Sequence, residues 1–362
     1  MADTISFARG APSLDIVDVE GLRAAADAAF TSDPAGTTAY GTSIGYVPLR
    51  RWIAEKHGVS ESRVLVTNGS MQADAFLFDA LVKPGDAVVV EKPTYDRTLL
   101  GLRNRGAEIH MVELETDGID VAALRELLEG GLRPKLAHII PNFQNPAGYT
   151  LSAAKRTELL KLAGEFGFTL FEDDPYIEIR FRGEPLPTML SLEAREDGQV
   201  VYASSFSKTV CPGIRVGYLV GPEELIRKIA GLATNTYISP NMVAQSIVHQ
   251  FCTSGRIEDA VKTVSGALAE RVEALTKALG EHLPEARFQA PEGGYFMWVE
   301  LPEGTDVHVL FDRAAEHGVT FVKGTDFLLE GGENTLRLAY SGVTAEQIGE
   351  GVRRLAAAYA EL

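Results

Sequence analysis

A lysine stands among serines in the stretch YASSFSKTV, residues 202–210, directly after the apolar run GQVVYA. At the rim of a partly buried site and near other cations, the amine of Lys208 would have a pKa below its usual value of about 10.4, which exposes a nucleophile for Schiff-base formation. Arg215 follows seven residues later and Ser205 lies alongside. These two groups could hold a phosphate while Lys208 holds an aldehyde. The alternative is an ordinary surface lysine after a strand.

Polar turns also follow two other apolar runs. Asn68-Gly69-Ser70 precedes a helical pattern that begins at Met71, so we expect Ser70 to cap that helix and its free amides to favour a phosphate. An ordinary capped glycine turn is the alternative. The stretch NFQNPAGYTLS, residues 142–152, is rich in turn formers, and the side-chain amide of Asn145 could donate to a ligand oxygen over the sheet edge.

Three acids, Glu172-Asp173-Asp174, end another apolar run and precede Tyr176. They could bind a metal, but the seven histidines are scattered and none joins them in a ligand spacing, so no metal is expected. One carboxylate offered to a cationic organic group fits better, with Tyr176 supplying a phenol. A phosphate pocket, an amine, a carboxylate for a pyridinium nitrogen and groups for a ring hydroxyl together match pyridoxal 5'-phosphate.

The elements that must position these groups alternate along the chain. Continuous apolar strands separated by helices predict a mainly parallel sheet covered on both faces, whose ligands collect at the carboxyl ends of the strands. The expected strands are 63–67, 86–90, 136–141, 169–174, 200–206 and 215–221, and the expected helices are 71–82, 95–106 and 152–167.

A different pattern begins after Gly255. A long helical stretch at 257–283 precedes strands at 293–301 and 334–341, with one helix between them and another at the end. We therefore predict three parts: an N-terminal segment, 1–44, with a loop and one helix that pack on the small domain; a large cofactor-binding α/β domain, 45–254; and a small α+β domain, 255–362.

Composition limits the class of protein. The chain has 362 residues, 45% of them hydrophobic and 23% charged, which suits a two-domain globular protein. A net charge of -16 argues against a nucleic-acid surface. No apolar run approaches the roughly 20 residues of a membrane span, and the start lacks a signal-peptide pattern, so a cytoplasmic protein is expected. Cys211 and Cys252 are expected to be reduced thiols.

In these motifs the sequence resembles the class I/II, fold-type I pyridoxal-phosphate aminotransferases, in particular the branch of 2-aminoadipate, branched-chain and aromatic aminotransferases. The resemblance covers nearly the whole chain and is carried by FARGAPS, TAYGTSIGYVPLRRWIA, VTNGSMQA, EKPTYDRTL, PNFQNPAGYTLS, FEDDPYIEIRF, SSFSKTVCPGIRVGYLVGP, PEGGYFMWVEL and NTLRLAYS. It implies a large domain with a mainly parallel sheet sandwiched by helices, plus a smaller α+β domain.

The resemblance also implies roles for single residues. Lys208 matches the internal-aldimine lysine that moves the substrate proton, and Asp173 matches the acid that keeps the pyridine nitrogen protonated. Tyr176 and Asn145 match the pair that bonds the ring hydroxyl, and Tyr95 matches the aromatic that stacks on the ring, although a core aromatic is the alternative. The phosphate would be held by Ser70, the Met71 amide, Ser205 and Arg215.

Further implied roles concern the substrate and a second subunit. Tyr40 would reach the phosphate of the neighbouring subunit's cofactor, which implies a homodimer with shared active sites. Arg337 matches the arginine that grips the substrate α-carboxylate, with Gly10 closing near it, although a strand-end salt bridge is the alternative for Arg337. Arg9 could neutralise a distal substrate carboxylate or could be an exposed arginine, and both interpretations stay open.

The implied reaction moves an amino group from an L-amino acid to a 2-oxo acid by a ping-pong route through pyridoxamine phosphate. Glutamate and 2-oxoglutarate are the expected pair on the resemblance alone. A β-lyase, decarboxylase or oxidase on the same scaffold is the main alternative, because the motifs do not fix the fate of the carbanion. A transcription factor would need a DNA-binding module before TISFA, and a dehydrogenase would need GxGxxG; we expect neither.

Overall fold

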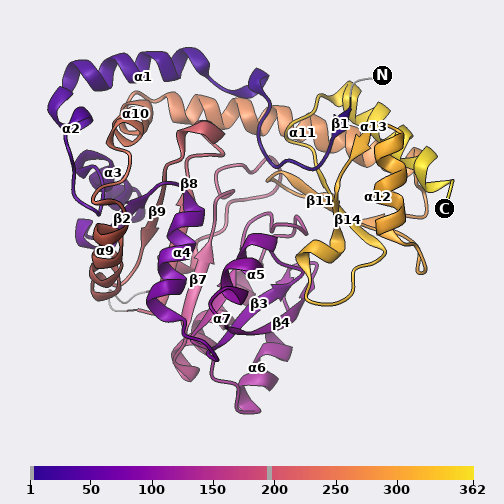
Figure 1. Cartoon of the computed structure of the whole chain (residues 1–362), viewed down its shortest axis with the longest axis horizontal. Helices are drawn as coiled ribbons and strands as arrows, with labels where there is room; N and C mark the ends of the chain where they lie inside the picture. Colours follow the sequence, from indigo (N-terminus) through magenta and orange to yellow (C-terminus); the bar gives the residue numbers. More distant parts are fainter. Residues whose placement is uncertain (1–3, 194–197) are drawn as a thin grey trace.

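The computed structural model describes residues 4–193 and 198–362, and its centre is an eight-stranded mixed sheet (Figure 1). Strands β8, β7, β6, β3 and β4 are parallel, whereas β9 and β5 pair antiparallel with their neighbours. A mainly parallel sheet is therefore confirmed. The order is β2 (Val64–Thr67), β9 (Gly217–Val220), β8 (Val200–Ser205), β7 (Thr169–Asp173), β6 (Leu136–Ile139), β3 (Ala87–Lys92), β4 (Glu108–Glu115), β5 (Gly118–Ile119).

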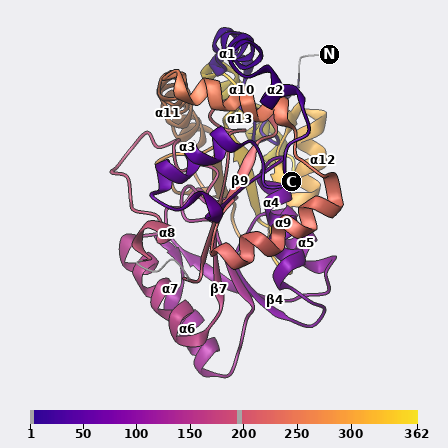
Figure 2. The ribbon, with the colours of Figure 1, turned by 90° about the vertical axis from the view of Figure 1, so that its left-hand side faces the viewer.

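Helices cover both faces of this sheet. Along β2, Val64 and Val66 join one hydrophobic core and Leu65 joins another, as the period-two alternation of a strand requires. Both faces are thus buried, which explains the continuous apolar runs. One core includes α3 (Val47–His57), α6 (Val121–Glu129), α7 (Ala153–Phe166) and α10 (Met242–Thr253), and the other includes α4 (Ser70–Leu81), α5 (Asp96–Arg103) and α9 (Glu223–Tyr237). Figure 2 shows α6 and α7 on one side of the strands and α4, α5 and α9 on the other.

The remainder of the chain builds a smaller layer beside the large sheet. Helix α11 (Arg256–His282) packs against α13 (Ala345–Tyr359), and both cover an antiparallel sheet. Its strands follow the order β10 (Arg287–Phe288), β11 (Phe296–Glu300), β14 (Thr335–Ala339), β13 (Val322–Lys323), and α12 (Val307–Glu316) lies between β11 and β13 in sequence. The predicted smaller α+β part is confirmed by this arrangement.

The N-terminal segment contacts both parts. Strand β1 (Ile5–Ser6) pairs in parallel with β12 (Val319–Thr320) of the smaller part. Helix α1 (Val19–Ser32) then packs against α10, and a second short helix, α2 (Pro34–Thr38), follows where only one helix was expected. Figure 1 shows α1 running beside α10, away from β1. The exact boundaries at 44 and 254 stay a prediction.

No helix within residues 4–193 and 198–362 combines the length and the apolar character that a membrane crossing needs.

Candidate active site

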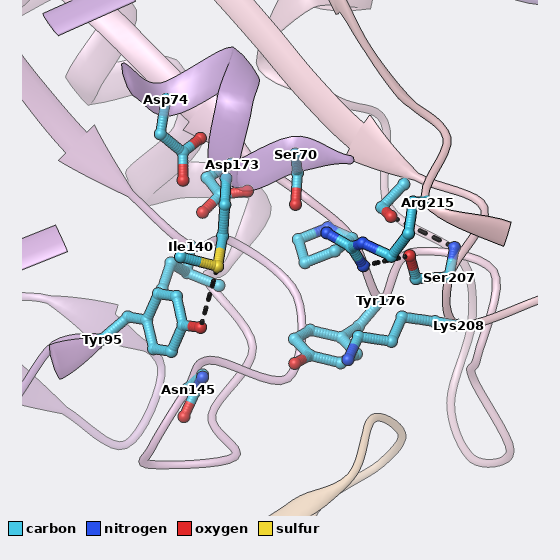
Figure 3. A pocket seen from close by; sticks show the side chains of 13 residues that line it. Ser70, Asp74, Tyr95, Ile140, Asn145, Asp173, Tyr176, Ser207, Lys208 and Arg215 are labelled. Carbon is cyan, nitrogen blue, oxygen red and sulfur yellow. Dashed lines mark hydrogen bonds between the residues drawn. The ribbon is translucent and has the colours of Figure 1, made fainter. Parts of the chain in front are cut away.

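A cavity of about 140 Å³ lies at the carboxyl ends of the parallel strands (Figure 3). It brings together residues from β7, from the turns after β6 and β8, and from the first turn of α4, which are far apart in sequence. Among the predicted site residues it is lined by Ser70, Met71, Tyr95, Asn145, Asp173, Tyr176, Ser205, Lys208 and Arg215. Asp74, Ile140, Pro175 and Ser207 also line it and were not predicted.

Lys208 is partly buried, and its amine lies among cations and aromatic rings. Its Nζ donates to the backbone oxygen of Gly10 at 3.0 Å and lies 5.5 Å from the ring centre of Tyr176. Burial first, and then the charges of Arg215 and Arg337, lower the pKa of Lys208 to about 8. The neutral, nucleophilic form of the amine is therefore far more populated near neutral pH than for an ordinary lysine.

An anion cradle lies beside this amine. Arg215 donates from Nη1 to the Ser207 hydroxyl at 3.0 Å, and the Ser207 amide donates to the Ser205 hydroxyl at 3.1 Å. A Cβ at Gly69, where φ is +88°, would lie 2.3 Å from Nη2 of Arg215, so only glycine lets the guanidinium approach the start of α4. Cation, hydroxyls and helix amides at one spot suit a phosphate.

The prediction that Ser70 caps α4 is wrong. The helix begins at Ser70 itself, its N-cap is Gly69, and no side chain caps it. Gly69 takes the N-cap position with φ of +88°, a conformation that glycine adopts readily. The Ser70 side chain is consequently free to line the cavity.

Asp173 ends β7 at the opposite end of the cavity. It is 5% exposed, and its Oδ2 lies 3.2 Å from Nε2 of the fully buried His138 on β6. Its Oδ1 has no hydrogen-bond partner among the described residues. A buried carboxylate oxygen without a donor is costly, and a cationic N–H of a ligand would satisfy it.

Arg337 connects the small sheet to this cavity. From β14 its Nη1 donates to Oδ1 of Asn145 and its Nη2 to the backbone oxygen of Ala8, both at 2.8 Å. Its guanidinium also lies 4.1 Å from the ring centre of Phe296. The partners are an amide and a carbonyl rather than a carboxylate, so the strand-end salt bridge is not what forms. A guanidinium held by neutral acceptors can still take a carboxylate.

Tyr95 lies at the cavity wall just before α5, with its hydroxyl 4.0 Å from the Met71 sulfur. Burial first, and then nearby acids, raise its pKa to about 12, so the phenol stays protonated. Gly10 lies against the ring of Phe296, where a Cβ would approach to 2.4 Å. The glycine thus lets the N-terminal segment reach Lys208.

Four predicted residues are not among those that line the cavity: Gly10 and Arg337, which contact the lining residues Lys208 and Asn145, and also Tyr40 and Arg9. Tyr40 is 87% exposed and lines a separate surface pocket with Tyr46 and Met242. Arg9 is exposed on the segment whose backbone contacts Lys208 and Arg337. The single chain therefore does not bring Tyr40 to its own cavity.

The residues present fit pyridoxal phosphate. Arg215, Ser205 and Ser207 suit the phosphate, Lys208 suits the aldehyde, and the unpartnered oxygen of Asp173 suits the ring nitrogen. Among the described residues, no cluster of three or more His, Cys, Asp and Glu side chains could hold a metal ion.

Comparison with known proteins decides the family. The model of the family "Aminotransferase class I and II" matches residues 2–355. The chain belongs to this family. Like the family, this aminotransferase depends on pyridoxal 5'-phosphate.

Similar proteins cover nearly the full chain. The 2-aminoadipate transaminase of Thermus thermophilus is 36% identical over 97% of this chain and 89% of its own length. The aromatic-amino-acid aminotransferase 1 of Thermococcus litoralis is 33% identical over 98% of this chain and 88% of its own. The solved α-aminoadipate aminotransferase of Thermus thermophilus, complexed with N-(5'-phosphopyridoxyl)-L-leucine, has a TM-score of 0.94 at 35% identity, covering 99% of this chain and 92% of its own. The predicted family and fold-type I class are confirmed.

Two further site residues of this aminotransferase, Ser207 and His138, were not predicted, although the sequence pattern indicates both. Ser207 stands two residues after Ser205, so both hydroxyls can face one ligand in the turn after β8. His138 lies inside an expected strand, and β6 pairs it with Phe171, two residues before Asp173. A polar residue within an apolar run, beside the run that ends in Asp173, pointed to this contact.

Proposed function

We propose that this aminotransferase transfers the amino group of an L-amino acid to a 2-oxo acid in two half-reactions at one cavity, with Lys208 as the cofactor-binding and proton-moving amine. Amino-group transfer itself is the activity of the family. The observation that carries the residue assignment is the convergence of a lysine of lowered pKa, an Arg215–Ser207 cradle and a buried free carboxylate oxygen in one cavity.

When bound, pyridoxal phosphate supplies an aldehyde that accepts the amino group and a ring that withdraws electrons from the substrate Cα. Arg215, Ser205, Ser207 and the first amides of α4 hold the phosphate. Asp173 would accept a hydrogen bond from the ring nitrogen through its unpartnered Oδ1 and would keep that nitrogen protonated. Tyr176 and Asn145 line the same cavity and are placed to bond the ring hydroxyl, and Tyr95 contributes its ring as a wall.

Lys208 acts at two stages. The neutral amine would hold the cofactor aldehyde, and Nζ would also accept the proton of the substrate Cα and return it. A pKa of about 8 suits both uses, because the neutral and protonated forms are then both populated near neutral pH. Holding the cofactor at Nζ would displace the Gly10 carbonyl, which accepts a hydrogen bond from this amine.

Arg337 binds the substrate α-carboxylate through its two terminal nitrogens. Because these nitrogens donate to Asn145 and Ala8, the substrate has to replace at least one of these acceptors. A planar two-point contact orients the Cα–H bond, which general-base removal by Lys208 requires. We also propose Gly10 as the residue that lets the N-terminal segment close over the substrate.

Glutamate and 2-oxoglutarate are the substrate pair that we propose. Support comes from similarity to enzymes named for 2-aminoadipate, a dicarboxylic amino acid of the same kind. Arg9, exposed on the segment that touches Lys208, is a candidate for the distal carboxylate. The enzymes among the similar proteins are named aminotransferases, and this does not favour a lyase, decarboxylase or oxidase.

We propose that this aminotransferase forms a homodimer. We also propose, from the sequence alone, that it is cytoplasmic. Tyr40 is 87% exposed and Ile238 is 60% exposed. A partner subunit would cover these two large hydrophobic side chains. In this dimer Tyr40 reaches the phosphate of the partner's cofactor, which leaves each cavity incomplete in a single chain.

The test is a half-reaction. Cofactor-loaded protein is mixed with single L-amino acids without any oxo acid, and the visible cofactor band and the released oxo acid are measured. We expect L-glutamate or L-2-aminoadipate to bleach the band and to yield at most one oxo acid per site. Continuous consumption of the amino acid, with release of ammonia or carbon dioxide, would instead support a lyase, oxidase or decarboxylase.

A further inference from the structure

A second carboxyl group lies at the Asp173 end of the cavity. Asp74 is on α4, one turn after Ser70, and is 8% exposed. Its side chain lines the same cavity as Asp173, and Figure 3 shows both carboxyl groups at the same end. Oδ1 of Asp74 and Oδ1 of Asp173 both lack a hydrogen-bond partner among the described residues. Neither the ring nitrogen nor the phosphate needs two acids at this position.

Two buried carboxylates at one end of a cavity cannot both be ionised without a large cost in free energy. Asp173 has a possible donor in His138 at 3.2 Å. For Asp74, burial first and the negative charge of Asp173 second raise the pKa well above its ordinary range. Asp74 is therefore the acid of this pair that keeps a proton.

Other titratable and charged groups surround this pair from several elements. Burial first, and among the charges that of Asp173, raise the pKa of Glu91 to about 8 and of Tyr95 to about 12, and raise the pKa of Asp174 and Tyr176 well above their ordinary ranges. A cation would favour an ionised Asp74, but Lys208, Arg215 and Arg337 act on Asp74 less strongly than burial and the charge of Asp173 do.

We propose that Asp74 is a positioning residue that stays a neutral acid and donates a hydrogen bond to the Asp173 carboxylate. The inference deepens the proposed function, because it rests on Asp173 as the partner of the ring nitrogen. A carboxylate has about four acceptor sites, so Asp173 can accept from Asp74, from His138 and from a ring N–H together. This hydrogen bond gives a partner to Oδ1 of Asp74 and to Oδ1 of Asp173. It also fixes the orientation of the Asp173 carboxylate.

The first test uses the apoprotein and infrared difference spectra with ¹³C-labelled aspartate. Asp74→Asn should remove a C=O stretch of a protonated aspartic acid at neutral pH, whereas the label excludes Glu91 and Glu172. Buried Asp174, whose pKa is also raised, contributes equally to both spectra and cancels. Asp79→Asn, on the exposed face of the same helix, is the matched control and should remove no such band. If Asp74→Asn also removes none, Asp74 is ionised and the proposal is wrong.

Thermal unfolding gives a second readout. A carboxyl whose pKa is higher in the folded state than its ordinary value of about 3.9 binds more protons folded than unfolded, so its contribution to stability falls as pH rises. Asp74→Asn removes this pH-dependent contribution. The melting temperature of the variant, relative to that of wild type, should therefore rise between about pH 5 and pH 8. The same measurement on Asp79→Asn shows what the loss of an exposed carboxylate on α4 does to the melting temperature. A difference in melting temperature between Asp74→Asn and wild type that does not change with pH would contradict a neutral Asp74.

The third readout is the affinity for the cofactor in two variants of Asp74. If Asp74 had only a structural role, the two variants would not differ in the way described next. Asp74→Asn keeps a donor and should bind pyridoxal phosphate about as tightly as wild type, whereas Asp74→Leu should bind about tenfold more weakly. Equal affinity of all three proteins overturns the positioning role. Failure of wild type itself to bind the cofactor would instead contradict the proposed function, while the infrared result on Asp74 would stand.

Discussion

Nη1 of Arg337 donates to Oδ1 of Asn145 at 2.8 Å, which joins the small sheet to the turn after β6 across the cavity. The two residues are 192 positions apart in sequence. The proposed carboxylate-binding group and the proposed ring-hydroxyl partner are thus in contact before substrate arrives. Binding of the α-carboxylate at Arg337 would therefore change the hydrogen bonding of Asn145, the proposed partner of the ring hydroxyl.

Arg337→Ala should reduce kcat/KM by about 30-fold to several thousand-fold, because truncating one partner of a buried charged pair costs about 2 to 5 kcal/mol. Arg337→Lys keeps the charge but not the planar fork, so it should recover only part of the loss. Steady-state kinetics with amino acid and oxo acid measure both. An increase in KM for one substrate class alone would contradict a shared carboxylate site.

The lowered pKa of Lys208 predicts how cofactor capture depends on pH. Only the neutral amine attacks an aldehyde, so the association rate of pyridoxal phosphate with apoprotein should rise with pH and level off above about pH 8. Stopped-flow absorbance measures this rate, with Lys208→Ala as the control that forms no covalent band. A midpoint near the ordinary value of about 10.4 would mean that burial and Arg215 do not act on the amine.

Gly69→Ala should weaken cofactor binding without unfolding the protein. The new Cβ would meet Nη2 of Arg215 at 2.3 Å, and φ of +88° disfavours any side chain at a cost of about 1 to 3 kcal/mol. Gly164→Ala is the matched control, since Gly164 lies within α7 and no atom is within 4 Å of its added Cβ. Equilibrium titration with pyridoxal phosphate should separate the two variants, and equal affinities would refute the packing role of Gly69.

The shared-site proposal for Tyr40 is tested by mixing two defective variants. Tyr40→Ala and Lys208→Ala chains should each lose activity, while a refolded mixture should regain part of it, because one cavity of a mixed dimer receives both native residues. Light scattering on each variant checks that the dimer survives. An inactive mixture of intact dimers would show that Tyr40 does not act on the partner's site.

Sequence alone predicted the parts of the site that stand within one motif or at a strand end. Lys208, Ser205 and Arg215 share one turn, and Asp173 ends a strand, so local pattern placed them. Asp74 was not predicted because it lies inside the helical pattern at 71–82, and which face of α4 meets the cavity depends on how the helix packs.

Edge strands were equally hard to predict from sequence. Strand β4 lies near the edge of the large sheet and pairs with the two-residue β5, and exposed and buried positions are mixed along it. It therefore lacks the continuous apolar run that marked β3 and β8. The contact of Arg337 with Asn145 likewise depends on how the two parts pack, which no local pattern encodes.

Borohydride reduction followed by peptide mapping tests the central claim most directly. Reduction of the cofactor-loaded protein should fix pyridoxyl on Lys208, and prior incubation with an effective L-amino acid, without oxo acid, should abolish this labelling because the cofactor has left the lysine as an amine. Labelling of another lysine, or labelling of Lys208 that no amino acid prevents, would contradict amino-group transfer through Lys208.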